Sequence, residues 1–93
     1  VMSQKDMIFK IWGLDAGDAA RLTEKVSCDA LENSLLTIYK YLCFLFPQEA
    51  VRNNWMRKPN GAFDGRRPID LILEDGELGL DVVEKYLAGA MQR

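Results

Sequence analysis

The acidic residues of the C-terminal third are the first candidates for chemistry. Two carboxylates at a suitable distance can supply an acid and a base for catalysis. Six lie close together in the sequence: Asp70, Glu74, Asp75, Glu77, Asp81 and Glu84. No spacing singles out a pair, and carboxylates at helix starts and on polar faces are ordinary solvated groups. We therefore expect an acidic, solvated surface here.

The sequence offers few residues that could act as nucleophiles or bind a metal ion. The sequence contains no histidine and two cysteines, Cys28 and Cys43. Without histidine, the usual zinc ligand sets and the commonest general base are excluded. There is also no CxxC, GxSxG or P-loop motif. Both cysteines lie among or beside apolar residues, so buried free thiols are expected, with a disulfide as the alternative. We predict no enzymatic activity, no catalytic residue, no metal and no cofactor.

Basic residues concentrate between residues 51 and 68. There, Arg52, Arg57, Lys58, Arg66 and Arg67 stand against the single acidic residue Asp64. This local charge of +4, in a chain of net charge -2, leaves -6 for the remaining residues. Affinity for DNA grows with the number of phosphates neutralised, and five cations make a small footprint.

The segment that displays these cations reads PNGAFDGRRP from residue 59 to residue 68. Asn60-Gly61 and Asp64-Gly65 are turn dipeptides whose glycines would adopt positive φ. No alternating apolar residues flank them. The segment is therefore predicted to be a structured loop with Phe63 tucked inward.

Two short helices are predicted before residue 27. The first has a stripe of apolar residues and ends at Gly13; the stripe comprises Met7, Ile8, Ile11 and Trp12. The second runs from Ala16 to Lys25, with Asp15 as its N-cap.

The third helix, from about Asp29 to Phe46, has the strongest pattern. One apolar stripe repeats at four and three residues, and a second lies beside it: Leu31, Leu35, Ile38, Leu42 and Leu45, then Leu36, Tyr39, Cys43 and Phe46. A helix apolar over so much of its surface is packed on more than one side. We expect Leu35, Ile38 and Leu42 to be nearly fully buried. Asp29 followed by Glu32 predicts a capping box.

Three further helices follow. The fourth, about residues 47–57, begins at Pro47 and places Val51 and Trp55 one turn apart. Pro68 opens the fifth and Gly76 closes it. The sixth runs from about Glu77 to Met91. Its apolar residues form a main face and a second stripe beside it: Leu80, Val83, Leu87, Ala90 and Met91, then Leu78, Val82 and Tyr86.

These elements predict an all-α fold, a compact bundle of about six short helices around one central, long apolar helix. We divide the chain into an N-terminal helical extension, residues 1–28, and a main domain, residues 29–93. The extension could be a reduced helix-turn-helix. A monomer of this size would leave Trp12, Tyr39 or Phe44 exposed, so a homodimer or larger oligomer is predicted.

The segment around the loop resembles a known family. It contains Trp55, Pro59-Asn60, Gly65, Pro68, a Leu-rich helix from Leu71 to Leu73, Gly76, and the apolar Val83 and Leu87. Their order and spacing are similar to those of the toxin-binding domain of Xre/MbcA/ParS-type antitoxins. The preceding Leu-rich helix that ends at Phe46 is also similar, and the resemblance covers residues 30 to 92.

The resemblance implies an antitoxin-like protein of a bacterial toxin–antitoxin system that binds and neutralises a cognate toxin. In this family the toxin is often of the RES type, which consumes NAD, and the antitoxin commonly dimerises. Many members carry a complete N-terminal DNA-binding domain that represses their own operon. Fewer than 30 residues precede the family region in this sequence, which puts that function in doubt.

Two alternatives remain: a helical homodimerising or adaptor module without a toxin, and a small DNA-binding regulator. The chain has no signal segment, and its longest apolar stretch is too short to span a membrane, so a cytoplasmic protein is expected. Val1 ahead of Met2 suggests a cloning scar before a nearly complete protein.

The partner-binding residues are predicted in the loop and at the C-terminal end of the last helix. They are Arg57, Lys58, Asn60, Arg66, Arg67, Met91 and Arg93. A second set is predicted to shape the loop and its flanking helices: Trp55, Pro59, Gly65, Pro68 and Gly76. Turns that fix the backbone reduce the entropy lost on binding, and arginine suits forked contacts with carboxylates or phosphates.

Overall fold

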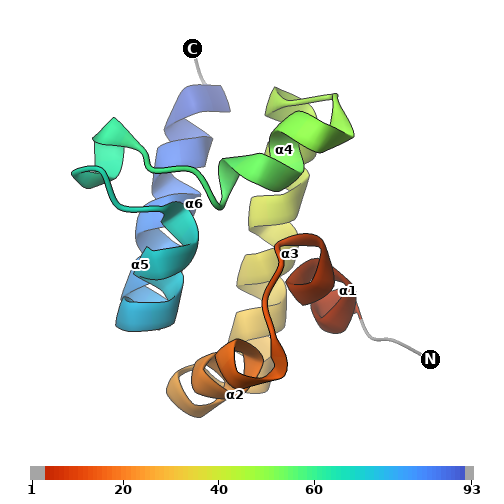
Figure 1. The fold of residues 1–93 in the computed structure, drawn as a ribbon, viewed down its shortest axis with the longest axis vertical. Helices are drawn as coiled ribbons and strands as arrows, with labels where there is room; N and C mark the ends of the chain where they lie inside the picture. Colours follow the sequence, from red (N-terminus) through yellow and green to blue (C-terminus); the bar gives the residue numbers. More distant parts are fainter. Residues whose placement is uncertain (1–3, 92–93) are drawn as a thin grey trace.

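The polypeptide forms six α-helices and one short 3₁₀ helix, which the computed structural model describes for residues 4–91, apart from the side chain of Cys28 (Figure 1). The helices are α1 (Gln4–Ile11), α2 (Ala16–Lys25), α3 (Cys28–Leu45), α4 (Glu49–Trp55), η1 (Gly61–Phe63), α5 (Pro68–Asp75) and α6 (Glu77–Met91). No strand occurs in this part of the chain. The predicted all-α class is confirmed.

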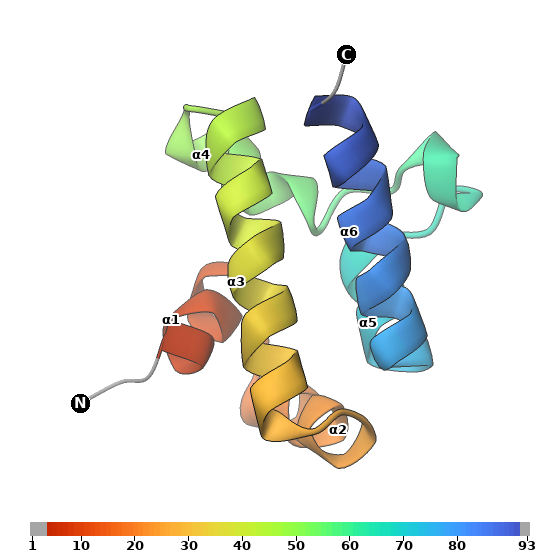
Figure 2. The ribbon, with the colours of Figure 1, turned by 180° about the vertical axis from the view of Figure 1, so that it is seen from behind.

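Helix α3 is the longest element and lies in the middle of the bundle, with α1 on one side and α6 on the other (Figure 2). It packs against α1, α2, α4 and α6, and α5 packs against α6 and α2. The side chains of Leu31, Leu35, Ile38 and Leu42 are all 0% exposed. The prediction for Leu35, Ile38 and Leu42 is thus confirmed, because a stripe with a spacing of four and three residues stays on one side of a helix.

The starts of α2 and α5 agree with the sequence, and that of α3 differs. Asp15 caps α2, where its Oδ1 accepts a hydrogen bond from Asp18 N at 2.8 Å. Pro68 occupies the first turn of α5. The capping box at Asp29 is wrong: α3 begins one residue earlier, with Ser27 in extended geometry as its N-cap, and Asp29 lies within the first turn. There its charge still favours the positive end of the helix dipole.

The inward side of α1 also differs from the predicted stripe. Ile8 and Phe9 are buried, whereas Met7 is 50% exposed. Trp12 follows the last residue of the helix and is 1% exposed. The chain therefore covers Trp12 by itself, and this residue gives no reason to expect a partner copy.

Helix α4 is shorter than predicted. Its N-cap is Gln48, so Pro47 lies ahead of the helix rather than in its first turn. Val51 is 46% exposed, while Met56, just after the helix, is 0% exposed. The residue that the end of this short helix places in the core is thus Met56, which the sequence analysis did not single out.

The junction between α5 and α6 is tight. Gly76 ends α5 with φ +59°, as a residue that closes a helix often does, and its N–H donates to Ile72 O at 2.9 Å. Three residues later, Gly79 lies directly against the backbone of Leu71. The absence of a side chain at Gly79 lets the two helices approach this closely.

The N-terminal helices share the core of the remaining chain. Ile8, Trp12 and Leu22 belong to the same cluster of buried residues as α3 and α6. In addition, Lys25 Nζ donates to the carbonyl oxygens of Leu73 at 2.8 Å and Glu74 at 3.0 Å. The division at residue 28 stays a prediction, and packing is continuous across it. Within residues 4–91, no helix has the length and apolar character needed to cross a membrane.

Candidate functional site

The loop between α4 and α5 is held by its own backbone and by Asn60. Asn60 Oδ1 accepts a hydrogen bond from Ala62 N at 2.9 Å, and the Asn60 backbone pairs with Arg66 O at 3.1 Å and with Gly65 N at 3.0 Å. Positive φ occurs at Asp64 and Gly65. The prediction of positive φ at Gly61 is wrong, because Gly61 starts the 3₁₀ turn. The amide oxygen of Asn60 therefore shapes the loop.

The two arginines at the end of the loop bind carboxylates of α5. Arg67 forms two hydrogen bonds with Asp70, Nε to Oδ2 at 2.8 Å and Nη2 to Oδ1 at 2.7 Å. Arg66 pairs with Glu74 and, at 3.8 Å, with Asp75. The hydrogen bonds from Arg67 lower the pKa of Asp70, and those same bonds raise the pKa of Arg67. Sequence counting therefore overstates the free positive charge of the loop.

Two other cations of the loop have no carboxylate partner among residues 4–91. Arg57 Nη2 donates to Asn54 Oδ1 at 3.1 Å, and its guanidinium lies against Gly13. Lys58 is exposed and makes no ion pair within the described part of the chain. Because few unpaired cations remain, the loop makes a smaller footprint for phosphates than its composition indicates.

A cluster of four aromatic rings joins this loop to the helices around it. Trp55 stacks on Tyr86, with 6.1 Å between ring centroids and 12° between planes. It also contacts Phe46 and Phe63, each at 6.4 Å. Phe63 meets Tyr86 edge-on at 5.2 Å. Phe63 is 8% exposed, so the predicted inward position is confirmed. The cluster fixes η1 against α6 through apolar contact and ring geometry.

The outer side of α6 is apolar and uncovered. Leu78 is 74% exposed, Val82 is 46% exposed and Tyr86 is 41% exposed. Their spacing of four residues places them in one row on the helix. We call these three residues the α6 face. It begins just after the α5 carboxylates that bind Arg66, and the Asp81–Lys85 ion pair, at 3.0 Å, lies along the same helix.

The α6 face is the feature that the partner-binding prediction missed. The sequence shows Leu78, Val82 and Tyr86 as a second stripe, but a stripe beside a core-facing one is usually covered by a neighbouring helix. Here α3 and α5 pack against the core-facing side of α6, which carries Leu80, Val83 and Leu87. No described element is left to cover the second stripe.

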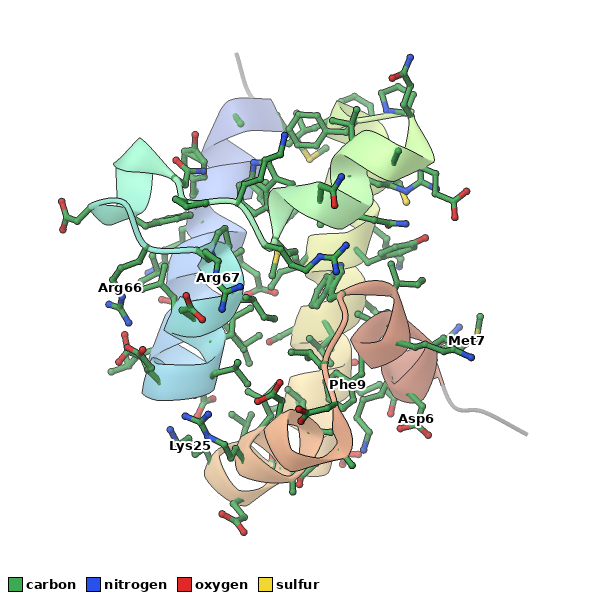
Figure 3. The ribbon with its side chains drawn as sticks, in the orientation of Figure 1. Asp6, Met7, Phe9, Lys25, Arg66 and Arg67 are labelled. Atoms are coloured by element: carbon green, nitrogen blue, oxygen red, sulfur yellow. The ribbon has the colours of Figure 1, made fainter. Side chains whose placement is uncertain are left out.

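The remaining predicted residues lie apart from one another. Met91 is the last residue of α6 and is half-buried, whereas Arg93 lies outside the described residues. Pro68 and Gly76 are buried, and Pro59 and Gly65 are exposed. Figure 3 shows Arg66 and Arg67 beside α5, on the opposite side of the molecule from Met7.

The described residues contain no group of three or more cysteines or carboxylates that could hold a metal ion. Cys43 is a free thiol, as predicted, but it is half-buried where a buried thiol was expected, because its stripe on α3 lies beside the core-facing one. Burial and the nearby Asp81 raise the pKa of Glu84. This carboxyl is half-buried on the polar side of α6.

Comparison with known proteins identifies residues 44–90 as a match to the antitoxin Xre/MbcA/ParS C-terminal toxin-binding domain. The uncharacterized protein y4oB of Sinorhizobium fredii is 36% identical over 53 residues. That alignment covers 57% of this chain and 41% of y4oB, so the chain spans less than half of that relative. No solved structure matches the chain.

Proposed function

Because the chain belongs to the family of Xre/MbcA/ParS antitoxin C-terminal toxin-binding domains, we propose that it binds a cognate toxin through one continuous surface and thereby neutralises it. This surface consists of the α6 face and the loop of residues 57–67. The observation that supports a single continuous surface is the contact between Phe63 of the loop and Tyr86 of the α6 face, whose ring centroids are 5.2 Å apart. Both parts lie inside the matched segment.

The two parts have different roles in the proposal. The α6 face supplies apolar area, and burial of a large apolar side chain contributes about 1.5–3 kcal/mol. The loop supplies Lys58 and Arg57 as cations and, at its edge, arginines that are already held by carboxylates. Charges at a rim mainly increase the rate of association and exclude wrong partners. Since the rings and turns hold both parts in place, little entropy is lost on binding.

The toxin is proposed to be of the RES type, which consumes NAD, as the family resemblance implies. In this proposal the chain has no catalytic activity and neutralises the toxin by binding to it. Met91, the last residue of α6, and Arg93, which lies outside the described residues, stay proposed contacts.

The test first determines whether a neighbouring gene encodes a RES-like protein, and then expresses that protein together with this chain. The wild-type chain is expected to co-purify with it and to prevent NAD loss in cells that express it. A Leu78→Ser, Val82→Ser variant should bind about 10- to 100-fold more weakly, because two central apolar side chains are removed. The matched control is Phe44→Ser, since Phe44 is 68% exposed but lies outside the α6 face and the aromatic cluster.

Circular dichroism must show unchanged helix content in each variant. Failure of the wild-type chain to co-purify with the RES-like protein contradicts the proposed function. An equal loss of toxin affinity in the Phe44→Ser control contradicts the assignment of toxin binding to the α6 face. The loop has its own variant, a triple change of Lys58, Arg66 and Arg67 to Ala. Undiminished affinity of the triple variant would remove the loop from the surface, and selective loss of DNA binding would instead favour the regulator.

A further inference from the structure

The charged residues beside the α6 face form a second row along the same helix. This row consists of Glu77, Asp81 and Lys85, which are spaced by four residues and each stand one position before a residue of the α6 face. Because residues three apart are neighbours on a helix, Asp81 lies beside Leu78 and Lys85 lies beside Val82. From the start of α6 toward its end, the row reads negative, negative, positive.

All three charged side chains are accessible to a partner. Glu77 is exposed and forms no ion pair within residues 4–91. Asp81 and Lys85 pair with each other at 3.0 Å, but their side chains are 50% and 78% exposed. An exposed ion pair of this kind contributes little to stability, so both residues can also interact with charges on another protein. The two carboxylates at the end of α5 differ, because Arg66 already binds them.

The α6 face has a shape that suits a helix of the partner. Residues four apart rise about 6 Å along a helix, so Leu78, Val82 and Tyr86 form a ridge about 12 Å long. Ridges of this kind fit the grooves between the matching ridges of a second helix. A strand would instead bring unpaired backbone N–H and C=O groups against apolar side chains, since the backbone groups in the middle of α6 already bond within the helix.

On the basis of the proposed function, we propose that the toxin covers the α6 face with an amphipathic helix that carries basic residues beside its apolar side. The apolar residues of this helix lie on Leu78 and Val82. Its cations lie opposite Glu77 and Asp81, and an acidic residue toward its other end lies opposite Lys85.

The charged row is what selects this occupant. Nucleic acid and anionic lipid surfaces are negative and are therefore repelled by Glu77 and Asp81. A second copy of this chain is a poor match at this face. Two antiparallel rows centred on Asp81 place this residue against its own equivalent, and parallel rows place every like charge together. The face therefore fits a basic segment of a different protein.

Two synthetic helical peptides of about 15 residues test the charge preference without a toxin. Both have a row of leucines at four-residue spacing, which is flanked by two lysines in one peptide and by two glutamates in the other. The lysine peptide should bind the wild-type chain about tenfold more tightly, because attractions to Glu77 and Asp81 replace repulsions. Fluorescence anisotropy of the labelled peptides measures both affinities at about 0.15 M salt, where charges more than about 8 Å apart are largely screened.

Reversing the charges on this chain gives a second comparison. The variant Glu77→Lys, Asp81→Lys should invert the preference, so that the glutamate peptide binds more tightly. The matched control is Glu24→Lys, Glu49→Lys, which changes the net charge equally at exposed positions of α2 and α4 and should leave the preference unchanged. Circular dichroism checks that each variant keeps its helix content.

Equal affinity of the two peptides for the wild-type chain would overturn the proposal, as would an inverted preference in the control variant. The same Glu77→Lys, Asp81→Lys variant should bind the RES-like protein about tenfold more weakly than the wild-type chain. Undiminished toxin affinity in that variant would exclude a basic helix as the bound element and leave the proposed function intact. A preference for the lysine peptide without any toxin binding would contradict the toxin as partner and support a basic helix as the occupant of the α6 face.

Discussion

At the residue scale, the absence of a side chain at Gly79 determines how closely α5 and α6 pack. A Cβ at this position would overlap with the carbonyl group of Leu71, which is backbone and cannot move aside. We expect Gly79→Ala to destabilise the fold by about 3 kcal/mol or more, because the two helices must separate. Chemical denaturation measures this as a lower midpoint.

Gly89→Ala is the matched control on the same helix. A Cβ at Gly89 meets no atom within 4 Å. Alanine has a higher helix propensity than glycine, so this variant should be more stable by about 0.5 kcal/mol. A loss of stability in both variants would contradict the explanation by close approach.

Glu84 and Asp70 should give stability changes of opposite sign at neutral pH. Burial raises the pKa of Glu84 in the folded state. The stability that Glu84 contributes to the fold is therefore fully present below the unfolded pKa of about 4.3 and is lost as pH rises through the folded pKa. Glu84→Gln should therefore raise Tm slightly at pH 7, on the order of 1 °C because the group is only partly buried. The difference should disappear below about pH 4.

For Asp70 the sign is reversed. The hydrogen bonds from Arg67 lower its pKa, so the stability it contributes is present above its unfolded pKa of about 3.9 and is lost as pH falls through the folded pKa. Asp70→Asn should lower Tm at pH 7 and have a smaller effect in acid. Thermal melts across this pH range test both signs, and equal shifts in the same direction would contradict them.

Single residues also show where sequence reasoning stops. The cap at Asp15 could be predicted, because a side-chain bond to a backbone N–H three residues ahead is a local interaction. The inward position of Phe9 instead of Met7 could not, since both fit an amphipathic α1 and the choice depends on where α3 lies. The same holds for Arg66, whose partners Glu74 and Asp75 become neighbours only when the loop meets α5. Arg67 is different, because its partner Asp70 is three residues ahead and this ion pair is local.

At the element scale, α3 is the helix against which α1, α2, α4 and α6 pack, and a substitution in its buried stripe tests its central position. Ile38 is 0% exposed. Ile38→Asp would bury an unpaired carboxylate at a cost of several kcal/mol, enough to unfold a domain of this size. The helical signal should be lost or Tm should fall strongly. Asn33→Asp, at an exposed position of the same helix, should keep its midpoint.

Helix positions were predictable to within a few residues, and the bounds of α2 and α6 agree fully. Both have a clear apolar period together with a local start or stop signal. The observed start of α4 differs from the predicted one, because a proline such as Pro47 can lie in the first turn of a helix or just ahead of it. Met56, just after α4, is 0% exposed, and no local pattern indicates this burial.

At the scale of the whole molecule, α1 and α6 lie on opposite sides of α3 (Figure 2), so the α6 face is separate from the surface of α1.

The candidate site was only partly predictable at this scale. The family resemblance located the loop, because its glycines, prolines and Asn60 follow one another at fixed spacing. The exposure of Leu78, Val82 and Tyr86 is a property of the assembled fold, since it requires that no other helix reach the outer side of α6. The burial of Trp12, one residue offered as a reason for dimerisation, is likewise a tertiary property.

The contact between Trp55 and Tyr86 also gives the protein an optical property. The chain has two tryptophans, of which Trp12 is fully buried and Trp55 is half-buried against an exposed tyrosine. Indole emission depends on the polarity around the ring, so Trp12 should emit at short wavelength whether or not the α6 face is occupied. Trp55 lies beneath that face, and its emission should move toward the blue when a partner displaces water from Tyr86. The protein thus carries its own fluorescent reporter of binding, with a constant internal reference in the same spectrum.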